Sequence, residues 1–212
     1  MHTNVYIDGF NLFYGALKGR GPGLKWLDLG LLCRRLLPAN DIRRIRYFTA
    51  RVSTRPNDLR MPERQQTYLR ALQTIPILTI HEGDFKITYP WMPLYDPAAP
   101  TVPLTRVQVI KTEEKGSDVN LASYTILDAC RQDCDALVVI TNDSDLQEPI
   151  RLVKEELGLP VGVVNPHPAW KRSRAIKGTF FRQLRTSAVR QCQFPDVVKD
   201  VEGRPIYKPE GW

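Results

Sequence analysis

The sequence predicts an α/β fold with a central, mainly parallel sheet, an inserted antiparallel arm and an extended C-terminal tail. Short apolar runs rich in β-branched residues alternate with segments of helical period, which is the pattern of successive βα units. A segment at 82–112, rich in proline and aromatic residues, interrupts that alternation. We therefore expect a single domain over 1–190 that includes this arm, and a tail over 191–212 packed on the domain.

Length and composition limit the class of protein. The chain has 212 residues, of which 42% are hydrophobic, enough to build a core. It contains no apolar run of 18 residues, so we expect no membrane span. The N-terminus enters a strand without a basic or apolar leader, and the four cysteines and three histidines show no metal-site spacing. These features predict a cytoplasmic protein with reduced thiols.

The elements are predicted in a regular order. Strands are expected at 5–7, 42–50, 77–80, 85–89, 106–110, 136–140 and 161–164. Helices are expected from about 12, over 29–37 and 62–73, from 117, and over 147–157. Asn11 and Ser117 are the expected N-caps of two of these helices. The segment 173–184 is expected to be helical at least in part, with room for a short strand.

Four aspartates are predicted to meet at one edge of the sheet. Asp8 ends the first strand, and Asp143 and Asp145 follow the strand 136–140. Asp118 begins the helix that precedes that strand, and such a helix starts at the carboxyl edge of a parallel sheet. A simpler interpretation is that Asp143 or Asp145 only caps the following helix.

Clustered carboxylates predict a metal site. Four like charges within several ångströms repel each other, and a divalent cation is the expected compensation. Carboxylate oxygens suit Mg²⁺ or Mn²⁺, which activate water for attack on a phosphodiester. Without these four residues, 19 acidic residues remain against 30 basic ones, a balance of +11. An acidic site in a basic protein is typical of a nuclease.

A second charge feature predicts a polyanion-binding face. No acidic residue occurs between Glu156 and Asp196, whereas seven basic residues do, including Lys171, Arg172, Arg174 and Lys177. A solvated basic face is the alternative interpretation. Aromatic side chains of the 82–112 arm are candidates for stacking on bases, unless the arm packs on the core.

Three blocks of sequence resemble the NYN domain, a PIN-like nuclease family that includes the bacterial LabA proteins. In order they are Val5-Tyr6-Ile7-Asp8-Gly9-Phe10-Asn11, then Lys115-Gly116-Ser117-Asp118-Val119, and Ile140-Thr141-Asn142-Asp143-Ser144-Asp145-Leu146. The resemblance implies a PIN-like three-layer fold and metal-dependent cleavage of RNA. It implies a catalytic, metal-binding role for the four aspartates, and substrate or supporting roles for Asn11, Thr141 and Ser144. Many relatives carry an acid at the position of Tyr124, so we expect a one-metal or asymmetric site.

The leading functional hypothesis is a metal-dependent endoribonuclease acting on RNA, single-stranded RNA included. Lys115 and the basic residues after 170 would hold backbone phosphates. The alternative is an RNA-binding or regulatory module with weak or no catalysis. A phosphatase of the haloacid dehalogenase type is disfavoured, because its D-x-D motif would stand at the first strand, where Asp8-Gly9-Phe10-Asn11 is found. The oligomeric state is open, a homodimer included.

Overall fold

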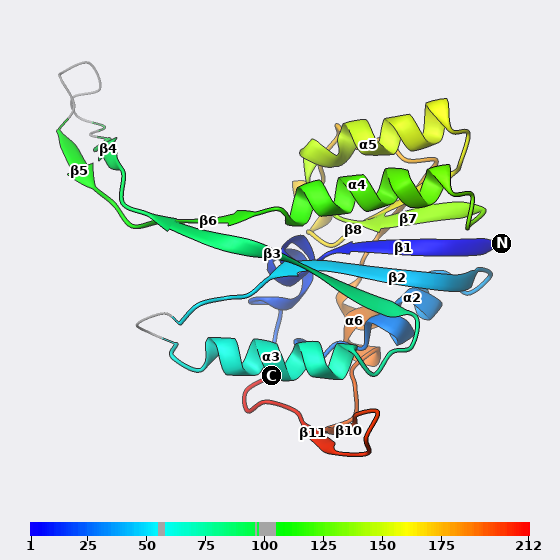
Figure 1. Cartoon of the computed structure of the whole chain (residues 1–212), viewed down its shortest axis with the longest axis horizontal. Helices are drawn as coiled ribbons and strands as arrows, with labels where there is room; N and C mark the ends of the chain where they lie inside the picture. The colour runs from blue at the N-terminus through cyan, green and yellow to red at the C-terminus, as the bar shows by residue number, and fades with distance from the viewer. Residues whose placement is uncertain (55–57, 96, 98–104) are drawn as a thin grey trace.

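Seven strands form one sheet in the order β6-β3-β2-β1-β7-β8-β9 (Figure 1). They are β1 (His2–Asp8), β2 (Asp41–Ala50), β3 (Leu78–Thr88), β6 (Lys111–Lys115), β7 (Ala136–Ile140), β8 (Val161–Asn165) and β9 (Phe180–Gln183). Every neighbouring pair is parallel except β3 and β6. This computed structural model describes residues 1–54, 58–95, 97 and 105–212. The predicted mainly parallel sheet is confirmed.

Strand β1 lies at the centre, and the chain builds the sheet outward from it in two directions. Strands β2 and β3 follow on one side, whereas β7, β8 and β9 follow on the other. The strand order therefore reverses between β1 and β7. Ligands of open α/β sheets bind at such a switch point, outside the carboxyl ends of the strands.

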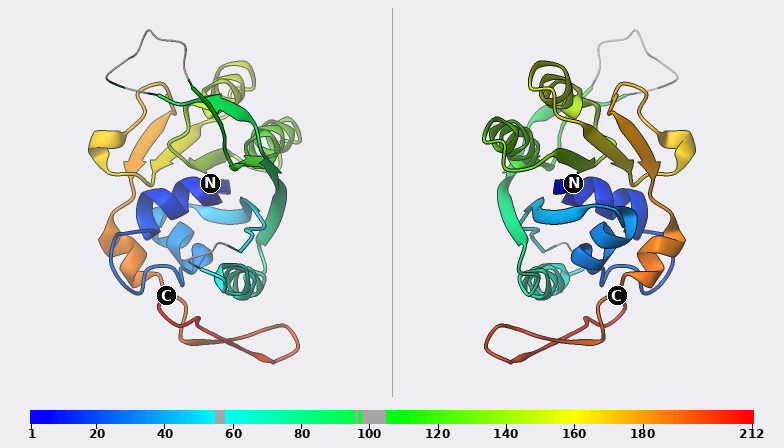
Figure 2. Two further views of the ribbon diagram at one scale, coloured as in Figure 1. Left: turned by 90° about the vertical axis from the view of Figure 1, so that its left-hand side faces the viewer. Right: turned by 90° about the vertical axis from the view of Figure 1, so that its right-hand side faces the viewer.

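Helices cover both faces of the sheet and make three layers (Figure 2). The helical elements are α1 (Gly9–Leu12), η1 (Phe13–Leu17), α2 (Leu29–Leu36), α3 (Met61–Leu72), α4 (Ser117–Cys130), η2 (Ser144–Leu146), α5 (Gln147–Arg151), η3 (Leu152–Glu156), η4 (Ala169–Lys171) and α6 (Thr186–Gln191). Side chains of β1 alternate between two cores, with Val5 and Ile7 facing α1, α2, α3 and α6, and Tyr6 facing α4 and α5. Across the described part of the chain, no helix is long and apolar enough to cross a membrane.

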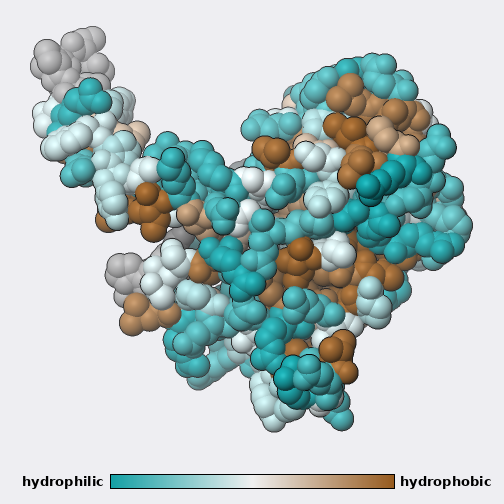
Figure 3. Space-filling model, in the orientation of Figure 1, coloured by the Kyte–Doolittle hydropathy of each residue, from teal (hydrophilic) through white to brown (hydrophobic). Residues whose placement is uncertain are grey.

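The antiparallel arm leaves the body as an extension of β3. The second half of β3, from Asp84, pairs with β6. Farther out along the arm, β4 (Trp91–Pro93) pairs with β5 (Arg106–Gln108). The arm projects into solvent instead of packing on the core (Figure 1). Its surface carries a few apolar patches among hydrophilic residues (Figure 3). Trp91 is 60% exposed. Residues 96 and 98–104 of the predicted arm lie outside the described residues.

Two C-terminal segments differ from the expected forms. The region 173–184 contains strand β9 and no helix, because Phe180–Gln183 pair in parallel with Gly162–Asn165 of β8. The Phe180 ring lies over Gly162, where a larger residue would collide with it. The tail contains a short hairpin of β10 (Val197–Lys199) and β11 (Pro205–Tyr207). It packs on the body through Ile206, which is 1% exposed.

A buried ion pair joins α4 to the middle of the sheet. Asp128 is fully buried and accepts hydrogen bonds from Arg46 Nε at 2.7 Å, Arg46 Nη2 at 2.9 Å and the Tyr6 hydroxyl at 2.8 Å. Burial acts to raise the pKa of Asp128, but the hydrogen bonds from Arg46 and Tyr6 lower it. One helix is thereby held against β1 and β2 at a single register.

Replacing Asp128 with alanine should destabilise the protein by about 3–5 kcal/mol, because Arg46, only 8% exposed, would keep a buried charge without its partner. Urea unfolding of the variant measures the loss. Glu148→Ala is the control, since it removes an exposed ion pair with Arg151 and should cost less than about 1 kcal/mol. Equal losses for the two variants would contradict a special role for Asp128.

Candidate metal centre

Three carboxylates converge at the carboxyl ends of β1 and β7. Asp8 ends β1, Asp118 lies in the first turn of α4, and Asp143 follows β7. Each offers an oxygen within 4.8 Å of the others. Carboxylate oxygens at this spacing match the donors that Mg²⁺ and Mn²⁺ take in proteins.

The side chain of Asp8 is fixed by its neighbours. Its Oδ1 accepts a hydrogen bond from the Asn11 backbone N–H at 2.9 Å, and its Oδ2 accepts one from the Thr141 hydroxyl at 3.0 Å. Asp8 is therefore the N-cap of α1, which begins at Gly9. A Cβ at Gly9 would lie 2.6 Å from the Phe48 carbonyl oxygen, so only glycine allows α1 to start this close to β2.

The prediction that Asn11 caps this helix is wrong. Asn11 lies inside α1, and its Oδ1 accepts a hydrogen bond from the Asn142 backbone N–H at 2.9 Å. The side chain thus joins the first helix to the segment that carries Asp143. Its carbonyl oxygen is occupied by this cross-link between the two halves of the site.

Asp143 both caps the following turn and belongs to the cluster. Its Oδ1 accepts a hydrogen bond from the Asp145 backbone N–H at 3.0 Å, and its own N–H donates to Thr141 Oγ1 at 3.1 Å. The capping interpretation and the metal interpretation therefore hold together. Thr141 is fully buried and orients Asp8 and Asp143, so its hydroxyl does not face the cleft.

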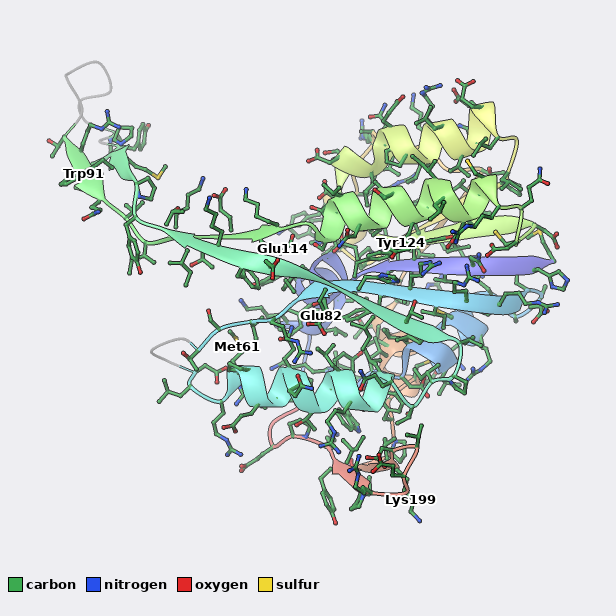
Figure 4. The ribbon with its side chains drawn as sticks, in the orientation of Figure 1. Met61, Glu82, Trp91, Glu114, Tyr124 and Lys199 are labelled. Atoms are coloured by element: carbon green, nitrogen blue, oxygen red, sulfur yellow. The ribbon has the colours of Figure 1, made fainter. Side chains whose placement is uncertain are left out.

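The start of α4 differs from the prediction and reveals a further acid. The N-cap is Gly116, in the left-handed region at φ 100°, and not Ser117. The Ser117 N–H instead donates to Glu114 Oε1 at 2.9 Å. Glu114 lies at the root of the arm (Figure 4) and lines the same cleft as Asp118. Sequence reasoning missed it because the position of β6 depends on the arm.

The electrostatics of the cluster favour a cation. Burial, together with the charges of Asp118 and Asp143, raises the pKa of Asp8 to about 7, against opposing hydrogen bonds from Asn11 and Thr141. Burial and the charges of Asp143, Glu114 and Asp145 raise the pKa of Asp118. Both shifts mean that negative charge is destabilised at this site, and a bound divalent cation would relieve it.

A cleft of about 770 Å³ opens beside the carboxylates. Its walls carry aromatic side chains from α1, η1, β2, α3, the arm and the tail, and two lysines, Lys18 and Lys25. Phe10 and Phe85 meet edge to face across it, with their ring centroids 5.6 Å apart. The cleft is therefore acidic at the strand ends and aromatic over much of its wall.

Other predicted site residues are placed unequally. Asp145 and Ser144 are exposed, and Asp145 lies outside the group of three, although its charge acts on Asp118. Lys115 is exposed at the end of β6, with its Nζ 3.6 Å from Glu113. Lys171 lies beside the cluster, because its carbonyl oxygen accepts a hydrogen bond from Asn142 Nδ2 at 2.9 Å.

Three more basic residues complete the predicted set. Arg172 packs its guanidinium over the Phe181 ring at 3.4 Å, and Arg174 is exposed. Lys177 lies at the opposite edge of the sheet from the carboxylates. The carbonyl oxygen of Lys177 accepts a hydrogen bond from Lys154 Nζ near the end of η3, and Lys177 itself precedes the start of β9. The fold therefore does not bring Lys177 to the carboxylates.

Tyr124 packs away from the cleft. Its ring lies 4.2 Å from the His81 ring and 4.4 Å from the Arg46 guanidinium, over the sheet (Figure 4). It does not line the cleft beside the carboxylates. The expected link between this position and an asymmetric metal site is therefore wrong, because residue 124 points from α4 to the buried ion pair.

Without metal, stability should fall as the pH rises from about 4 to about 7. Over this range native Asp8 keeps a proton that the unfolded chain has lost, so raising the pH favours unfolding, by about 2–4 kcal/mol. Urea unfolding across the pH range measures this fall in stability, once with chelator and once with about 5 mM Mn²⁺. Bound metal should reduce the fall. Asp8→Asn should remove most of the fall and leave the part due to Asp118, whose pKa is also raised, whereas Glu202→Gln on the tail should keep the whole fall. A fall unchanged in Asp8→Asn would assign it to another group.

Comparisons with known proteins found a curated relative and a solved structure that are similar to this chain. A 6-hydroxy-3-succinoylpyridine 3-monooxygenase, HspA, of Pseudomonas putida (strain DSM 28022 / S16) is 31% identical over 240 residues, covering 100% of this chain and 75% of HspA. A crystal structure of a Vibrio parahaemolyticus protein of unknown function has a TM-score of 0.56 at 13% identity, covering 87% of this chain and 93% of the other, and supports the fold alone.

The family model of the NYN domain matches residues 2–182, a span that holds all three carboxylates. The resemblance seen in the sequence is thereby confirmed. The chain belongs to the NYN domain family, within the PIN-like nuclease superfamily.

Proposed function

We propose that this protein is a metal-dependent endoribonuclease. The observation that carries the proposal is the convergence of Asp8, Asp118 and Asp143 at the switch point of the sheet, in a chain of net charge +7. Membership of the NYN family supports a nucleic acid as substrate. A cytoplasmic location is part of the same proposal.

The three carboxylates would hold Mg²⁺ or Mn²⁺, which supplies an activated water and stabilises charge on the phosphodiester. The chain supplies the orientation. Thr141 fixes one oxygen of Asp8 and the backbone of Asp143, so both carboxylates keep their positions as charge develops. Asp145 would act from outside the group through its charge, and Glu114 would do the same from the root of the arm.

The substrate would approach over the basic side of the cleft. Lys171 and Arg174 follow β8 on the side of the sheet away from the arm, and Lys115 stands at the arm's root. Ammonium and guanidinium groups here would bind backbone phosphates without reading bases. We retain Ser144, exposed beside Asp143, as a candidate phosphate contact.

Asp143→Asn should lower cleavage of RNA at least about 100-fold in Mg²⁺ or Mn²⁺, because it removes one of three charged ligands. Without metal, its fold should be as stable as the native protein or more stable, since one repelling charge is lost. Gel assays of mixed RNA with and without EDTA, with end-group analysis of products, measure activity. Asp145→Asn is the matched control and should lose less. Full activity in Asp143→Asn would remove that residue from the mechanism.

Reversing Lys171, Arg172 and Arg174 to glutamate should weaken RNA binding broadly across sequences and flatten its dependence on salt. Lys177→Glu should change affinity little, because that residue lies at the other edge of the sheet. Filter binding at several salt concentrations measures both. Unchanged affinity in the triple variant would make the acid-free stretch a solvated face.

An RNA-binding module with weak or no catalysis is the alternative within the same class. It predicts binding without products in any metal, so the EDTA comparison separates it from the nuclease.

A second candidate function comes from the name of the Pseudomonas putida relative, which describes oxygenation of a succinoyl-substituted pyridine. The aromatic walls of the cleft, with Lys18 and Lys25 among them, suit a planar ring that carries a carboxylate. Thermal shift and calorimetry with 6-hydroxy-3-succinoylpyridine test this. Absence of binding at millimolar concentration would exclude it.

A further inference from the structure

Trp170 is the most exposed aromatic side chain among the described residues, at 79%. It lies in η4, a single 3-10 turn between β8 and β9. An indole in contact with solvent over most of its surface adds little to the core. The fold therefore leaves this side chain free for a partner.

The turn that carries Trp170 is nevertheless held firmly beside the carboxylates. Asn142, the residue before Asp143, donates from Nδ2 to the Lys171 carbonyl oxygen at 2.9 Å, and its Oδ1 accepts from the Ser173 N–H at 2.7 Å. These bonds hold the last residue of η4 and the segment just after it. Asn142 itself is fixed by Asn11. The exposed ring is thus attached to the segment that positions Asp143.

Positive charge accompanies the ring. Lys171 Nζ lies 4.9 Å from the centre of the Trp170 ring. Lys171 and Arg20 both act, after burial, to lower the pKa of His167, which places two cations around that residue of the cleft wall. An aromatic face beside cations is the combination that binds single-stranded nucleic acids, because bases stack on the ring while cations neutralise phosphates.

We infer that Trp170 stacks on a base of single-stranded RNA close to the scissile phosphate, with Lys171 on an adjoining phosphate; this rests on the proposed nuclease function. The turn η4 and the arm lie on opposite sides of the carboxyl ends of the β-strands (Figure 2). An RNA strand stacked on Trp170 therefore reaches the carboxylates from the side of η4. Stacking needs an unpaired base, and duplex RNA does not offer one.

Binding of a 12-nucleotide RNA, chosen as roughly one site in length, is measured in the Asp143→Asn background. Trp170→Ala should weaken it about 5- to 150-fold, the range for loss of one stacked base, and Trp170→Phe should restore most of it. Tyr207→Ala, which removes an exposed aromatic ring from the tail hairpin, is the matched control and should leave affinity unchanged. Since Trp170 is exposed, its variants should keep the native melting temperature.

Abasic substitutions placed one at a time along the RNA separate stacking from a structural effect. One position should lose affinity for the protein that retains Trp170 and lose none for Trp170→Ala. Quenching of tryptophan fluorescence by RNA should decrease in Trp170→Phe. A duplex of the same sequence should bind independently of Trp170.

Equal binding by Trp170→Ala and its parent, or a loss that no abasic position matches, would overturn the inference. If RNA binding does not depend on Trp170 but the protein still cleaves RNA, the nuclease proposal stays intact. The converse result is RNA binding that depends on Trp170, together with no cleavage in any metal by the protein that retains Asp143. That result would overturn the nuclease proposal and keep the stacking site.

Discussion

The pairing of Asp128 with Arg46 and Tyr6 is the interaction on which the arrangement of the site depends. It attaches α4 to β1 and β2 at a buried point, ten residues and about 15 Å along the helix from Asp118. A helix fixed at one point and packed along its length has little freedom to slide. Asp118 is therefore held at the edge where Asp8 ends β1. A buried ion pair adds little net stability compared with apolar packing, but removing one partner is costly, so it specifies a register.

The site itself works against the stability of the fold. Three carboxylates within 4.8 Å repel each other, and burial disfavours the charge of Asp8. Hydrogen bonds from Thr141, Asn11 and the Asp145 backbone offset part of this cost and keep the oxygens oriented. Such stored repulsion is characteristic of functional sites. It favours a ligand that brings positive charge, which connects the electrostatics of the cluster with the chemistry proposed for it.

The surroundings of the site divide into regions of different character. An aromatic cleft lies beside the carboxylates, a cation-rich turn stands on the β8 side, and an exposed arm projects from the β3 side. The β8 side is firmly bonded to the residue before Asp143. The arm is attached to the body through β3 and β6, where Glu114 enters the cleft. Residues far apart in sequence therefore reach the region around the carboxylates through short, separate connections.

The sequence by itself determined the parallel sheet, the long helices and the meeting of Asp8, Asp118 and Asp143, because apolar period and strand ends are local signals and parallel strands share one edge. Tertiary structure decided what local signals leave open. Asn11 and Ser117 carry capping chemistry, yet Asp8 and Gly116 cap those helices, because the residue at which a helix starts depends on the backbone turn before it. Tyr124 faces Arg46, Glu114 faces the cleft and Lys177 lies at the far edge, since these positions follow from how α4, the arm and β9 pack. Local patterns fix which elements form, whereas long-range packing fixes which side chains meet.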